Sequence, residues 1–80
     1  MLAPKEALQV QNYVNSRLFD GKHVLTMEDA ANMQPIPGTR NGGGSYTILA
    51  TQYGDLTILV WVQYMEAGFM TIRYAHKQAW

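Results

Sequence analysis

The chain has 80 residues, enough for one small domain and too few for a second. It contains no cysteine, which excludes disulfides and thiolate metal sites, and its two histidines alone make a poor zinc site. Six basic and six acidic residues give a formal net charge of zero, which disfavours a protein that holds nucleic acid mainly through phosphates and equally an acidic nucleic-acid mimic.

The first predicted element is a helix that begins near Pro4, because proline is favoured in the first helical turn. Asp20-Gly21 is the expected end, since glycine readily adopts the left-handed conformation of a helix cap. Apolar residues recur between these points at helical spacing and form one stripe: Ala7, Val10, Val14 and Leu18, with Leu8 beside them. The opposite side is polar but nearly uncharged, which is unusual for a solvated helix side; its residues are Gln9, Gln11, Asn12, Asn15 and Ser16.

A second, short helix is predicted in TMEDAANM, residues 26–33. Thr26 is placed to cap it, with Asp29 three residues later, and Pro35 and Pro37 end it. The following QPIPGTRNGGGS, residues 34–45, is a loop by composition. The single domain therefore divides into a helical half (1–37), a glycine-rich joint (38–45) and a sheet half (46–80).

The glycine run at 42–44 does not predict a phosphate-binding loop. Such a loop needs a strand, then glycines, then Lys-Ser/Thr at the start of a helix, whereas these glycines precede a strand and no such pair follows. A dinucleotide fingerprint fails for the same reason of order, so no cofactor is expected. Arg40 and Asn41 can still make this loop a contact arm beside whatever the sheet binds.

From Tyr46 onward the pattern is that of strands. SYTILATQY (45–53), LTILVWVQYM (56–65) and FMTIRYAH (69–76) are rich in β-branched and aromatic residues. Gly54-Asp55 and the segment 66–68 separate them as hairpin turns. The predicted fold class is therefore α+β: an N-terminal helix and a short second helix followed by a three-stranded antiparallel meander.

Two-residue turns at 54–55 and 67–68 predict that Ala50 pairs with Leu59, Ile48 with Trp61 and Trp61 with Tyr74. One face of the meander would be the core face on which the first helix packs; it holds Ile48, Ala50, Leu59, Trp61, Met65, Met70, Ile72 and Tyr74. The other face has an aliphatic centre and a polar border; it holds Thr47, Leu49, Thr51, Ile58, Val60, Val62, Tyr64, Thr71, Arg73 and Ala75. A slip of one residue in either turn would exchange the two faces.

The central strand is thus apolar on both sides, and one helical layer cannot bury both. An uncovered aliphatic face usually marks an association surface. We therefore predict a non-enzymatic protein-binding module, a regulator or inhibitor that binds a protein partner or forms a homodimer. In the alternative, the QPIPG loop or the second helix folds over this face. The predicted partner-binding residues are Val60, Val62, Tyr64, Thr71 and Arg73 on the sheet, with Arg40 and Asn41 on the loop.

The C-terminal segment TIRYAHKQAW supports an alternative function, a small metal-independent ribonuclease that uses Arg73, His76 and Lys77. Arginine can stabilise a pentavalent phosphate, while histidine, lysine or the neighbouring tyrosine exchanges protons. His23 and Arg40 would complete such a site from the other half of the chain. Without that role, His76 and Lys77 are a solvated strand end.

The final hairpin, ILVWVQYMEAGFMTIRYAH, resembles RelE-type toxins, which are small ribosome-dependent mRNA interferases. The likeness covers under a quarter of the chain and consists of an apolar strand, a short turn and an Arg-Tyr-x-His ending. It implies that Arg73, Tyr74 and His76 correspond to the terminal catalytic residues of those toxins. The neutral charge of this chain departs from their strongly basic character.

Two further expectations concern partners. Aromatic residues on a sheet can stack nucleic-acid bases, but the strands contribute only Arg73 as a nearby positive charge, so nucleic acid is disfavoured. The start of the chain has no signal-peptide pattern, and its longest strongly apolar run, 56–62, is far shorter than a membrane span. We expect a soluble, cytoplasmic protein with no membrane contact.

Overall fold

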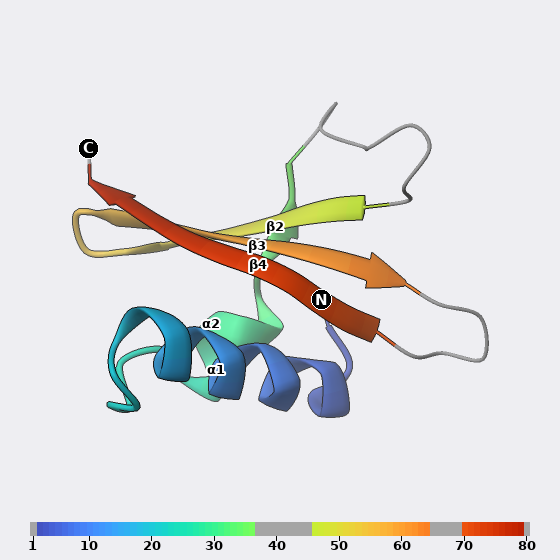
Figure 1. Ribbon diagram of the computed structural model, residues 1–80, viewed down its shortest axis with the longest axis horizontal. Helices are drawn as coiled ribbons and strands as arrows, with labels where there is room; N and C mark the ends of the chain where they lie inside the picture. Colours follow the sequence, from blue (N-terminus) through green and yellow to red (C-terminus); the bar gives the residue numbers. More distant parts are fainter. Residues whose placement is uncertain (1, 37–45, 65–69, 80) are drawn as a thin grey trace.

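The computed structural model describes residues 2–36, 46–64 and 70–79 as two helices packed under one antiparallel sheet (Figure 1). The elements are α1 (Pro4–Leu18), α2 (Met27–Ala31), β1 (Gln34–Pro35), β2 (Tyr46–Tyr53), β3 (Leu56–Tyr64) and β4 (Met70–Ala79). The strands follow chain order across the sheet, β1-β2-β3-β4. The predicted α+β class and meander are confirmed, with one short strand more than expected. None of the helices in these ranges is long and apolar enough to cross a bilayer.

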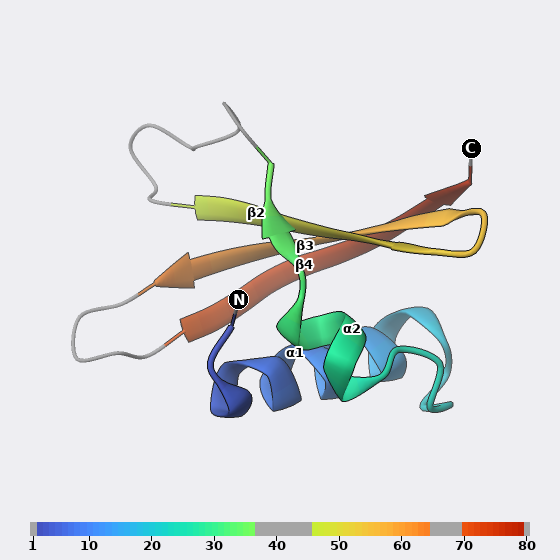
Figure 2. The same cartoon turned by 180° about the vertical axis from the view of Figure 1, so that it is seen from behind.

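The additional strand, β1, lies in a segment whose composition predicts a loop. Gln34 pairs with Ala50 and Pro35 with Leu49, and the Ile36 N–H donates to the Ile48 carbonyl at 2.9 Å. Proline is tolerated here because β1 is the outermost strand, as Figure 2 shows, and an edge strand need not donate on both sides. The prediction that residues 34–45 are entirely loop is therefore wrong at its first two residues, and 37–45 lie outside the described residues.

Helix α1 begins and ends where its sequence predicts. It starts at Pro4, and the Glu6 side chain accepts a hydrogen bond from the Ala3 N–H at 3.3 Å. Asp20 and Gly21 have φ of 55° and 82°, and the Gly21 N–H donates to the Asn15 carbonyl at 2.8 Å. The left-handed turn predicted at Gly21 therefore ends the helix. The stripe of Ala7, Val10 and Val14 is fully buried against the sheet.

Three of the uncharged polar side chains of α1 brace the fold through hydrogen bonds to backbone groups of other segments. Asn15 is buried; its Nδ2 donates to the Leu25 carbonyl at 3.0 Å and its Oδ1 accepts from the Leu25 N–H at 2.8 Å. Gln11 Nε2 also donates to the Leu25 carbonyl, at 3.1 Å. Gln9 Nε2 donates to the Met70 carbonyl of β4 at 2.7 Å. Amides suit these positions because they satisfy backbone groups without burying a charge.

Helix α2 is capped by Thr26, as predicted: its hydroxyl accepts a hydrogen bond from the Asp29 N–H at 3.0 Å. Replacing Thr26 by alanine is expected to lower the free energy of unfolding by about 1 kcal/mol, because a helix N–H loses its acceptor. Urea denaturation followed by far-UV circular dichroism measures this loss. Thr26→Ser, which keeps a hydroxyl, should stay close to wild type, and an alanine variant as stable as wild type would contradict the cap.

The register of the sheet confirms the predicted pairs. Ala50 lies opposite Leu59, Ile48 opposite Trp61, and Trp61 opposite Tyr74. The first hairpin has the two-residue turn expected at Gly54-Asp55, where Gly54 has a φ of 58°. The second turn lies outside the described residues.

Strand β4 contains a β-bulge, which regular alternation does not predict. Trp61 pairs with Tyr74 but Val62 pairs with Ile72, so Arg73 is an extra residue with no partner in β3. An extra residue reverses the side-chain alternation of the strand on one side of the bulge. Met70 and Ile72 therefore share a face with Val62 rather than with Trp61, contrary to the predicted core face.

The helices cover the opposite sheet face from the one predicted. Leu49, Ile58, Val60 and Val62 are between 0 and 2% exposed and form one core with the α1 stripe. Leu25, Ala30 and Met33 of the α2 region belong to the same core, so both helices lie on one side of the sheet, as Figure 1 shows. The assignment of Ile48, Ala50, Leu59, Trp61 and Tyr74 to the core is wrong. Alternation fixes which residues share a face, but it does not say which face a helix covers.

Candidate functional site

The sheet face turned away from the helices is the candidate functional site, and we call it the open face. Residues that lie opposite one another in adjacent strands point to the same face, so the register defines its rows. The two central rows run across β2, β3 and β4; they are Ile48-Trp61-Tyr74 and Ala50-Leu59-His76. The flanking rows are Tyr46-Gln63-Thr71 and Gln52-Thr57-Gln78.

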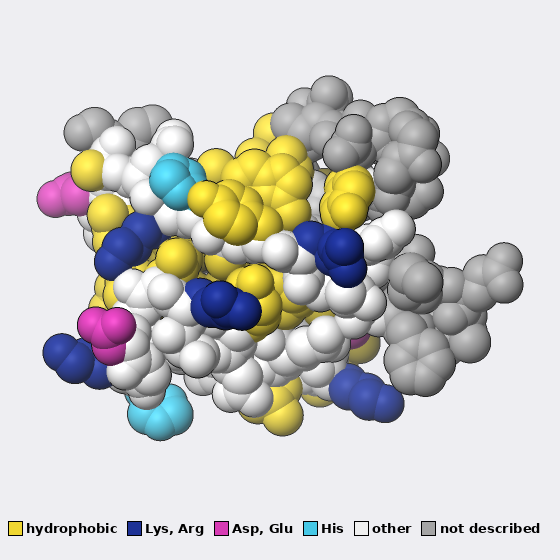
Figure 3. Space-filling view, in the orientation of Figure 1, with side chains coloured by type: hydrophobic (Ala, Val, Ile, Leu, Met, Phe, Trp, Pro, Cys, Tyr) yellow, Lys and Arg dark blue, Asp and Glu magenta, His cyan; other side chains and the backbone are white. Residues whose placement is uncertain are grey.

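Aromatic rings form the centre of the open face. The ring centroids of Trp61 and Tyr74 are 5.1 Å apart with an interplanar angle of 56°. The rings of Tyr74 and His76 lie nearly parallel, with centroids 6.3 Å apart. Tyr74 is 53% exposed, which is high for a tyrosine in the middle row of a sheet. Figure 3 shows hydrophobic side chains gathered above β4 with a histidine against them.

The rows of the open face have an apolar centre and a polar border, and Arg73 is exposed beside them at the bulge. None of the four rows contains Asp, Glu, Lys or Arg, and the flanking rows supply amide and hydroxyl groups. This arrangement matches the usual anatomy of a protein interface, in which a centre depleted of charge and rich in Tyr and Trp is surrounded by a polar rim.

The predicted partner-binding residues do not form one surface. Val60 and Val62 are buried on the sheet face that the helices cover, so they cannot contact a partner in this conformation. Thr71 belongs to a flanking row of the open face, and Arg73 is exposed at the bulge. Arg40, Asn41 and the side chain of Tyr64 lie outside the part of the chain that the structure describes.

The predicted nuclease residues are also separated. His76 is on the open face beside Tyr74, whereas Lys77 points to the helical side: its Nζ donates to the Leu18 carbonyl at 2.9 Å and lies 4.8 Å from the centroid of the Phe19 ring. His23 is in the connection between α1 and α2, within the helical layer. One phosphodiester on either face cannot contact both His76 and Lys77, so the structure does not bring these residues together as a catalytic set.

The sequence analysis grouped five residues of the open face together but assigned them to the core: Ile48, Ala50, Leu59, Trp61 and Tyr74. The signal that distinguishes the faces is the helix-side composition: β-branched Ile58, Val60 and Val62 pack tightly against a helix, while Trp61 carries a polar N–H that needs a partner or solvent. Within the described ranges, no group of three or more His, Asp or Glu residues is placed to hold a metal ion. Comparison with protein-family models, with curated proteins and with solved structures found no match to this chain.

Proposed function

We propose that this protein is a small non-enzymatic protein-binding module that covers an apolar surface of its partner with the open face. The observation that supports this proposal is the exposure of Tyr74 in a central row that contains no charge. Exposed aromatic side chains at the centre of an apolar patch are the usual anchors of protein interfaces. Such a module acts by occupying its partner's surface, as a regulator or an inhibitor does.

The distribution of positive charge favours a protein partner over nucleic acid. Lys5 and Arg17 are on α1, Lys22 follows that helix, and Lys77 points to the helical layer. The other basic residue of the described strands is Arg73, which is exposed at the bulge. A base-stacking sheet needs several cations along the phosphate path, because phosphate neutralisation supplies most of the affinity.

A second copy of the chain is the first partner to test. The four rows contain no Asp, Glu, Lys or Arg, so two copies of them can meet without placing like charges together, and a twofold dimer buries the same patch on both subunits. Association would also suit a domain of this size, which buries a modest share of its surface on folding.

Tyr74→Lys is expected to abolish binding with little effect on the fold. The change introduces a charge at the centre of the open face, and a central aromatic anchor typically contributes about 2 kcal/mol or more, equivalent to roughly 30-fold in affinity. Sedimentation velocity over a range of concentrations measures self-association, and affinity capture from the host measures other partners. The matched control is Tyr53→Lys, since Tyr53 is 39% exposed near the end of β2 and is outside the central rows.

Four results are distinguishable. A concentration-dependent dimer that Tyr74→Lys dissociates identifies a second copy as the partner. A monomer that captures a protein through Tyr74, with Tyr53→Lys behaving as wild type, identifies another chain. Binding of a fluorescent oligonucleotide that weakens steeply with salt would instead make the protein a nucleic-acid-binding module. A monomer that captures the same proteins with or without Tyr74 contradicts the proposal.

A further inference from the structure

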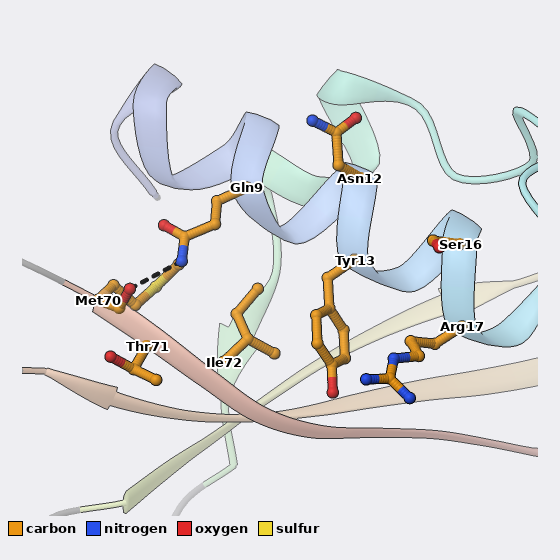
Figure 4. Close-up of a pocket in the computed structure, with 8 residues that line it drawn as sticks. All are labelled: Gln9, Asn12, Tyr13, Ser16, Arg17, Met70, Thr71 and Ile72. Atoms are coloured by element: carbon orange, nitrogen blue, oxygen red, sulfur yellow. Dashed lines mark hydrogen bonds between the residues drawn. The ribbon is translucent and has the colours of Figure 1, made fainter.

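A groove lies between α1 and β4, and it shares Thr71 with a flanking row of the open face. It has a volume of about 630 Å³, within the range of ligand-binding clefts. Figure 4 shows its construction: Gln9, Tyr13 and Arg17 project from successive turns of α1 toward β4, and Ile72 projects from β4 toward the helix. The groove therefore has an apolar floor, one cation and a strand along one side.

The strand beside the groove is an edge of the sheet, because β4 is the last strand in the order and pairs with β3 alone. Gln9 Nε2 donates to the Met70 carbonyl from the groove side at 2.7 Å, which shows that this carbonyl accepts a donor placed there. Backbone groups of alternate residues in an antiparallel strand point to the same edge, so Ile72 directs its N–H and C=O the same way as Met70. The bulge at Arg73 interrupts this repeat and limits regular pairing to the first residues of β4.

Arg17 makes the groove selective for negative charge. Its guanidinium carbon lies 5.4 Å from the centroid of the Tyr13 ring, a cation–π contact that orients the side chain beside the groove. No acidic residue is among the described residues that line the groove. Helix α1 contacts β4 at two points: Gln9 bonds to Met70, and Leu18 bonds to Lys77. Arg17 lies between these two points on the helix and therefore faces the part of β4 that follows Ile72.

We infer that the groove binds an extended peptide segment that contains a carboxylate. The peptide backbone pairs with the outer edge of β4 at Ile72, next to the Met70 carbonyl that Gln9 occupies. Its apolar side chains contact Ile72 and Tyr13, and its carboxylate binds Arg17. Backbone pairing supplies affinity without sequence preference, while Arg17 supplies the preference for an acidic residue. This inference does not rest on the proposed function, because it uses no residue of the two central rows of the open face.

Selection from a phage-displayed library of random heptapeptides tests it on the purified full chain. The wild-type protein is expected to enrich peptides that share an Asp or Glu among β-branched residues. For a synthetic enriched peptide, Arg17→Gln should weaken binding about tenfold, and replacing the peptide's acidic residue by its amide should cause a similar loss. The two changes together should weaken binding no further than either one alone, because both remove the same contact.

Two controls separate the groove from the rest of the molecule. Lys5→Gln removes another exposed cation of α1 that does not line the groove, and it should leave peptide binding unchanged. Tyr74→Lys should also leave it unchanged, whatever it does to binding at the open face. In addition, N-methylation of alternate peptide amides should abolish binding for one set of positions and spare the other, as strand pairing requires.

The inference is overturned if the library enriches no peptide, or if the enriched peptides lack acidic residues. It is also overturned if Arg17→Gln binds an enriched peptide as tightly as wild type does, or if Tyr74→Lys rather than Arg17→Gln removes binding. Tolerance of N-methylation at every position would show that the peptide does not add to the edge of β4.

Discussion

Val62→Arg is expected to prevent the domain from folding. Val62 is 0% exposed and packs in the core between the sheet and α1, so an arginine there would place an unpaired charge among apolar side chains. Such a charge costs several kcal/mol, comparable with the whole stability of an 80-residue domain, which is about 4–12 kcal/mol at 0.05–0.15 kcal/mol per residue. Circular dichroism should show loss of the cooperative urea transition.

Thr57→Arg is the matched control for this experiment. Thr57 is on the same strand, β3, but belongs to a flanking row of the open face, where an arginine side chain reaches solvent. Its effect on the free energy of unfolding should stay within about 0.5 kcal/mol. If Val62→Arg folds normally while an arginine at Trp61 does not, the helices cover the other face and the proposed interface is wrong.

Asn15→Ala is expected to lower the free energy of unfolding by about 2–4 kcal/mol. The buried Asn15 amide bonds to both the N–H and the carbonyl of Leu25; alanine removes the acceptor of the N–H and leaves the carbonyl with the Gln11 amide alone. For a domain of 60–100 residues, this loss corresponds to a fall in Tm of roughly 10–30 °C. Differential scanning calorimetry measures it directly.

Asn12→Ala provides the comparison, because Asn12 is exposed on the same helix and alanine is the better helix former. Its Tm should equal or slightly exceed that of wild type. Equal losses at the two positions would show that Asn15 does not hold the 22–26 connection against α1.

Local signals in the sequence predicted the helices well. Pro4 and Gly21 bound α1, and Thr26 caps α2, because each of these features depends on residues within about four positions. The same holds for the Gly54-Asp55 turn, which sets the register between β2 and β3. These parts could be read from the chain because their determinants are short-range hydrogen bonds and backbone conformations.

The candidate site could be predicted in part. The sequence grouped Ile48, Ala50, Leu59, Trp61 and Tyr74 on one face, and the structure confirms that they share it. The prediction that this face is the core face was nevertheless wrong, because β3 is apolar on both sides and hydrophobicity alone does not say which side packs against α1. Packing decides between them: compact β-branched side chains fit against a helix, and the larger rings of Trp61 and Tyr74 remain on the other side.

By itself, the sequence determined one small α+β domain, its helix ends and its first hairpin. It also determined the two cross-strand pairs that Trp61 makes, with Ile48 and with Tyr74. The tertiary structure decided three further features: the bulge at Arg73, the side of the sheet that α1 covers, and the groove beside β4. The physical reason is the range of the interactions that set each feature. Turns and caps are set by neighbours in the chain, whereas a bulge or a covered face is set by the fit between surfaces that the chain brings together only on folding.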